Sequence, residues 1–95
     1  MTAPLVKDMG LRAAEILRGL PRAAGPLPWR EDAGRMVIGE AGRGVSITLR
    51  ALPDRRVGSL CLPVTRVTMV FDGLPEVDRQ SFLARFDRAF HRGGG

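Results

Sequence analysis

One stretch near the end of the chain restricts its fold more than any other, and it covers residues 64–73. Apolar side chains alternate there with polar ones, and β-branched residues dominate. Because successive side chains of a strand point to opposite faces, the alternation predicts a half-buried strand. Its inward face comprises Thr65, Val67, Met69 and Phe71. Asp72 and Gly73 then supply residues that are typical of a turn.

A helical pattern follows this strand directly, from Glu76 to His91. Pro75 suits the first turn of a helix, and the apolar residues after it recur at helical spacing. Since consecutive elements joined by a short turn usually pack together, we expect the rings of this helix to lie on the inward face of the strand as the main core. The rings are Phe82, Phe86 and Phe90, and their expected partners are Val67, Met69 and Phe71.

The N-terminal part of the chain predicts a second amphipathic helix, from Leu5 or Val6 to Leu20, which Gly19 and Pro21 would end. Its apolar stripe is Met9, Ala13, Ile16, Leu17 and Leu20. Residues 21–29 hold three prolines and indicate an extended connector. Trp29 closes this connector, where its ring either caps an edge of the core or anchors a binding partner.

The middle of the chain predicts a hairpin, with strands over Arg35–Gly39 and Val45–Ala51 and a glycine-rich loop at residues 40–44. Residues 53–56 indicate the next turn. Leu60–Leu62 forms either a short strand of its own or the start of the final strand, and Pro63 would place it at an edge or a break.

The predicted order is therefore α-β-β-(β)-β-α. Short links between strands imply an antiparallel meander, and both helices need an apolar surface to cover. We expect one α+β domain over residues 1–95. It would be a two-layer sandwich with a three- or four-stranded sheet and the N- and C-terminal helices on one face. Residues 1–4 and 93–95 are expected to be loose ends, the latter a glycine stop after the helix.

The residues that usually carry catalysis are scarce in this chain. It has one cysteine and one histidine, so Cys61 has no partner for a disulfide, and a Cys/His metal site is not expected. Cys61 lies between two leucines, which favours a small buried apolar residue over a nucleophile. His91 suits the negative end of the last helix. We therefore expect no enzyme, and we assign no catalytic, metal-binding or cofactor-binding residue.

The chain is basic, with a formal net charge of +5, and 14 of its 15 basic residues are arginine. Together with 12 glycines and no tyrosine, this composition is typical of a GC-rich bacterial genome, which weakens any inference from charge to function. The charge still permits nucleic acid, anionic lipid or an acidic protein as partner. There is no apolar run long enough for a transmembrane helix and no pattern typical of a signal peptide, so the expected location is the cytoplasm.

The outward face of the predicted sheet is the candidate binding surface. By alternation it carries Val37, Ser46, Thr48, Arg50, Arg66, Thr68 and Val70. Such a face is either solvated, or buried by self-association or a protein partner, or used as a basic platform for nucleic acid. The third reading ranks below the second, because sheets that bind RNA usually stack bases on outward aromatic rings and this face has none. We expect a small protein-binding or assembly module, as a homodimer or a subunit of a larger complex, with nucleic-acid binding as the alternative.

Overall fold

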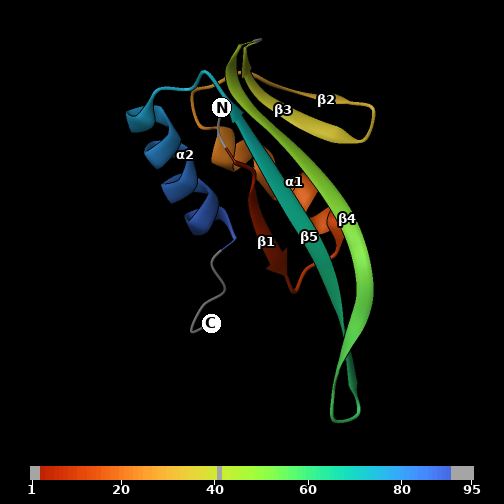
Figure 1. Cartoon of the computed structure of the whole chain (residues 1–95). Coiled ribbons are helices and arrows are strands. Elements are labelled where there is room, and N and C mark those ends of the chain that lie inside the picture. Colours follow the sequence, from red (N-terminus) through yellow and green to blue (C-terminus); the bar gives the residue numbers. More distant parts are fainter. Residues whose placement is uncertain (1–2, 41, 91–95) are drawn as a thin grey trace.

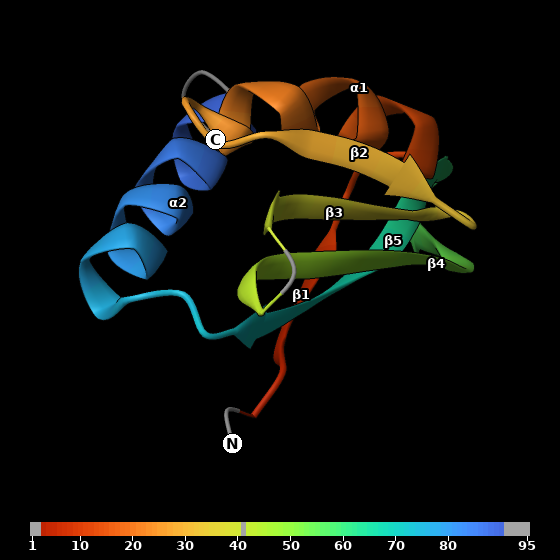
Figure 2. The ribbon, with the colours of Figure 1, turned by 90° about the horizontal axis from the view of Figure 1, so that it is seen from above.

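The computed structural model describes residues 3–40 and 42–90, which form a five-stranded antiparallel sheet and two helices (Figure 1). In chain order the elements are β1 (Leu5–Met9), α1 (Ala13–Ala24), β2 (Trp29–Asp32), β3 (Arg35–Glu40), β4 (Arg43–Val57), β5 (Leu60–Asp72) and α2 (Glu76–Ala89). The strands lie in the order β1-β5-β4-β3-β2. Both helices lie on one side of the sheet (Figure 2). The predicted α+β class is confirmed, with five strands in the described residues where three or four were predicted.

The core lies between the helices and the sheet face that they cover. Its main buried side chains come from α1 (Ile16, Leu20), β3 (Met36, Ile38), β4 (Val45, Ile47), β5 (Val67, Met69, Phe71) and α2 (Phe82, Phe86). The rings of Phe71 and Phe82 meet edge to face, with 6.0 Å between centroids. The C-terminal end of α2 packs beside α1. The ring of Phe90 there lies 4.8 Å from that of Phe86 and against Gly19. The final helix therefore contributes Phe82 and Phe86 to the core, and Phe82 meets Phe71 of β5 as predicted, but the main neighbour of α2 is α1 rather than β5.

The N-terminal helix begins later than predicted. Residues 5–9 form strand β1, which pairs with β5 so that Leu5 lies opposite Met69 and Met9 opposite Thr65. The helix starts at Ala13, after Gly10. The apolar spacing of Leu5 and Met9 fits a helix turn and also fits one face of a strand. The free edge of β5 decides between them, because it supplies backbone partners for the whole segment.

The same helix also ends later than predicted, since it continues past Gly19 and Pro21 to Ala24. A proline inside a helix removes one backbone hydrogen bond. The last turn is held from outside by Arg85 of α2. Its Nε donates to the carbonyl oxygen of Ala23 (2.8 Å) and its Nη2 to that of Ala24 (3.2 Å). A side chain far away in the sequence therefore supplies the cap.

The turn predicted at residues 53–56 is wrong. Strand β4 continues to Val57, and the chain reverses at Gly58, whose φ is +62°. Residues 60–62 are the start of β5, as one of the two alternatives had it. Pro53 and Asp54 form an irregularity opposite Pro63, where the pairing shifts between Leu52 and Arg55. Prolines are tolerated there because neither strand has a second neighbour at this point. We call residues 53–63 the arm, and Figure 1 shows it extending beyond the rest of the sheet.

Two short strands form the edges of the sheet. Strand β1 has five residues and β2 has four. Lys7 of β1 lies opposite Val67, on the side that the helices cover. Its Nζ is 3.1 Å from the carboxylate of Asp87 and 5.5 Å from the centroid of the Phe86 ring. A charged side chain thus points inward from an edge strand and is neutralised by α2.

Candidate interaction surface

The structure brings the predicted outward residues together on the side of the sheet away from the helices. Ser46 of β4 has Val37 of β3 as its partner on one side and Val70 of β5 on the other. Thr48 is paired with Thr68, and Arg50 with Arg66. Cross-strand partners share a face, so all seven residues form one surface. No helix of the described residues covers it (Figure 2).

The edge strands, which the sequence patterns did not reveal, enlarge this surface. Val6 lies opposite Thr68, and Asp8 lies opposite Arg66. At the other edge, Arg30 lies opposite Val37, and Asp32 opposite Arg35. We call the combined surface the outer face. It comprises Val6, Asp8, Arg30, Asp32, Arg35, Val37, Ser46, Thr48, Arg50, Leu52, Val64, Arg66, Thr68, Val70 and Asp72.

Most of the charge on the outer face is paired within it. The guanidinium of Arg66 donates to both carboxylate oxygens of Asp8, at 2.8 and 3.1 Å. These hydrogen bonds lower the pKa of the Asp8 carboxyl below its ordinary value, and the positive charge of Arg66 acts in the same direction. Asp32 has Arg30 at 3.7 Å and Arg35 at 3.9 Å. The paired charges flank a central band without charge, which consists of Val37, Ser46, Thr48, Thr68 and Val70.

Two charged side chains of the outer face, Arg50 and Asp72, have no ion pair among the described residues. Arg50 lies directly opposite Arg66, and like charges in that position repel. The Asp8 carboxylate, on the other side of Arg66, therefore offsets an unfavourable pair as well as forming a favourable one.

The arm carries an apolar row that continues the outer face. Along β5, Leu60, Leu62 and Val64 occupy every second position and lead into Arg66, Thr68 and Val70. Their partners on β4 are Val57, Arg55 and Leu52. The exposed fractions of Leu60, Leu62 and Val57 are 61, 42 and 49%. The sequence signal for this row was the period of two from Leu60 onward, which the two prolines obscured.

Trp29 and Cys61, which the sequence also singles out, both lie outside the outer face. Trp29 lies in edge strand β2 opposite Ile38, on the side of the helices, and is about half exposed (49%). As a candidate anchor it is thus separate from the outer face. Cys61 is exposed, so its interpretation as a buried residue is wrong. It lies opposite Arg56, in the row of the arm that faces away from Leu60 and Leu62. His91 and the glycines at 93–95 lie outside the described residues.

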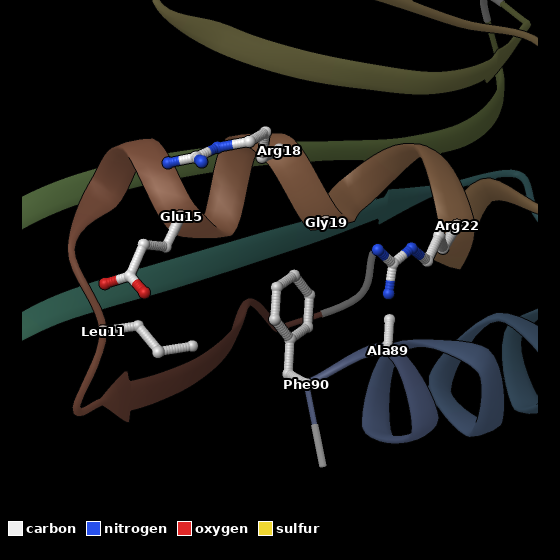
Figure 3. A pocket seen from close by; sticks show the side chains of 7 residues that line it. All are labelled: Leu11, Glu15, Arg18, Gly19, Arg22, Ala89 and Phe90. Atoms are coloured by element: carbon white, nitrogen blue, oxygen red, sulfur yellow. The ribbon is translucent and has the colours of Figure 1, made fainter. Parts of the chain in front are cut away.

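A hollow of about 350 Å³ lies between α1 and the C-terminal end of α2 (Figure 3). It is lined by Leu11, Glu15, Arg18, Gly19, Arg22, Ala89 and Phe90. The titratable side chains around it are one carboxylate and two guanidinium groups. Within residues 3–40 and 42–90, no three His, Cys, Asp or Glu side chains lie close enough to hold a metal ion.

The chain has no significant match among protein-family models, curated proteins or solved structures. In the described part of the chain, neither helix has the length and apolar character needed to cross a membrane.

Proposed function

We propose that this protein is a small, non-catalytic assembly module that binds another protein through its outer face. One observation carries the proposal: the exposed apolar side chains gather on one side of the molecule. The described residues include seven large hydrophobic side chains that are exposed. Five of them, Val6, Val57, Leu60, Leu62 and Val70, belong to the outer face or to its continuation on the arm. Scattered apolar residues are normal on a surface, whereas a gathered set is typical of an interface.

The charge pattern favours a protein partner over nucleic acid. A surface that binds phosphates needs cations that are available to replace counterions. On the outer face Arg66 is engaged by Asp8, and Arg30 and Arg35 lie near Asp32. Arg50 is the outer-face arginine that remains, and no outward aromatic ring is present there among the described residues to stack on a base.

The experiment is a pull-down from the native cells with the tagged full chain and two variants. Thr48→Glu places a charge in the centre of the uncharged band. Val77→Glu, a matched control, replaces a side chain on α2 that is 70% exposed and lies away from the outer face. We expect a partner, either another protein or the untagged chain itself, to be recovered with the wild type and the control and lost with Thr48→Glu. Equal recovery with all three proteins would contradict the proposal.

The nucleic-acid alternative is tested by fluorescence anisotropy with labelled single- and double-stranded oligonucleotides at several salt concentrations. If it held, the affinity would fall steeply with salt. Arg50→Ala combined with Arg66→Ala would then lower the slope of log affinity against log salt by roughly two. We expect no binding that has this dependence.

A further inference from the structure

We infer that the partner of the outer face is a second copy of this chain, and that the arm of each copy lies across the outer face of the other. This inference rests on the proposed function, because it names the partner of the same surface. It also gives the arm a role. No residue of the arm belongs to the core of the described residues, so the core does not explain why the arm is there.

The arm is the first reason. A two-stranded ribbon on its own is marginally stable in water, and three strands or a packed face are usually needed. The arm consists of two strands, and both are exposed along residues 53–62. Its apolar row, Leu60, Leu62 and Val57, has no cover in the described part of the chain. A face against which this row could pack would supply the missing burial.

The chemistry of the outer face is the second reason. A two-fold interface places the same surface on both sides, so that surface must be complementary to itself. Charges that are paired within one copy do not repel their equivalents in the other. The outer face carries four arginines and three aspartates, whereas the whole chain has a net charge of +5. Because its charges nearly balance while the chain as a whole is basic, the outer face can approach the same face of a second copy with little repulsion.

The shape of the central band is the third reason. It is formed by valine, threonine and serine side chains, which are small and allow two sheets to approach face to face at about 10 Å. The molecule measures 45 × 29 × 23 Å, and Figure 1 shows the arm along the long direction. A stable interface buries about 800 Å² on each partner. This is about an eighth of the 6322 Å² of accessible surface, which is the share that the outer face and the arm would together have to bury in each copy.

The test is sedimentation equilibrium of the purified full chain over a wide concentration range. The monomer has a mass of 10.3 kDa, and we expect the wild type to reach twice that mass. Leu60→Glu combined with Leu62→Glu should weaken the dimer by roughly 10,000-fold, because the two-fold interface loses four leucines, two from each copy, and each contributes about a factor of ten. These residues lie outside the core, so circular dichroism of the double variant should show the wild-type secondary structure.

Cys61→Glu is the control, since it places one such carboxylate on the same arm but in the opposite row. It should leave the dimer intact. If the wild type is a monomer at all concentrations while Thr48→Glu still abolishes recovery of another protein, the inference of a second copy is wrong and the proposed function stands. If the wild type is a dimer and the Leu60/Leu62 variant dimerises as well as Cys61→Glu, the role of the arm is wrong. A monomer that recovers no partner overturns both proposals.

Discussion

The aromatic ring of Phe90 occupies the space that a side chain at Gly19 would need. A Cβ built on Gly19 stands 2.6 Å from Cε1 of Phe90 and 2.9 Å from Cζ, closer than real Cβ contacts allow. Figure 3 shows the ring directed at this point of α1. The close approach of the end of α2 to α1 thus depends on the absence of a side chain at position 19.

This relationship predicts that Gly19→Ala will not raise the free energy of unfolding, as a replacement of glycine by alanine in a helix normally does. Replacing glycine by alanine inside a helix ordinarily stabilises it by about 1 kcal/mol. In the wild type that gain should be cancelled or reversed, because the ring of Phe90 must move. In a Phe90→Ala background the same substitution should show its full benefit. Urea denaturation of the four proteins of this double-mutant cycle measures the coupling, and equal effects in both backgrounds would contradict the packing described.

Phe86→Ala should destabilise the protein by about 3–5 kcal/mol, a large part of the stability that a domain of this size has. Phe86 is 1% exposed, packs between Phe82 and Phe90, and has Lys7 over its ring. Val77→Ala, on the exposed side of the same helix, is the control and should be nearly neutral. Thermal unfolding followed by circular dichroism compares the two. A melting temperature of Phe86→Ala within a few degrees of the wild type would show that α2 is not core.

The turn between β2 and β3 offers a stabilising substitution. Ala33 has a φ of +51° and Gly34 a φ of +82°, and Asp32 pairs with Arg35 across them. A side chain in the left-handed region costs about 1–2 kcal/mol, and asparagine tolerates it better than alanine. Ala33→Asn should therefore raise the free energy of unfolding by up to about 1 kcal/mol. Gly34→Ala should lower it, and denaturant titration that found the opposite order would exclude this turn conformation.

The Asp8–Arg66 pair predicts a dependence of stability on pH. Because the pKa of Asp8 is lowered in the folded protein, the pair stabilises the fold above the ordinary carboxyl pKa, and this contribution disappears as the pH falls through the lowered value. Wild type should be more stable than Asp8→Asn near neutral pH, and the difference should vanish in strong acid. Thermal unfolding across that range gives the difference. An NMR titration should show a higher Asp8 midpoint in Arg66→Ala.

Local patterns predicted the elements whose signals are complete within their own residues. The alternation in β5 and the helical spacing in α2 specify each element without help, so the inward and outward faces of β5 followed from parity. Strand β1 was missed because its identity depends on backbone partners in β5, about 60 residues away. The last turn of α1 was missed for the same kind of reason, since Arg85 holds it from the other helix.

The candidate surface, too, could be predicted only where the signal lies within one strand. Its central residues, such as Thr48 and Thr68, were predicted by the period of two. Its charge balance could not be predicted, because Asp8 and Asp32 belong to edge strands that were not recognised. The arm was missed because Pro53 and Pro63 gave local turn signals. In the fold they face each other at an irregularity where the ribbon has no outer neighbours, so they do not end the strands.

The inward position of Lys7 has a consequence for polymerisation. An edge strand can recruit strands from other chains and so build open-ended fibrils, and a charged side chain pointing inward from the edge opposes this. Strand β1 has this device, the short β2 carries Arg30, Glu31 and Asp32, and each strand of the arm contains a proline. Growth by strand addition is thus disfavoured at each of these edges. The association that we propose, through a face about a two-fold axis, would end after one step, so it would give a finite particle and not a filament.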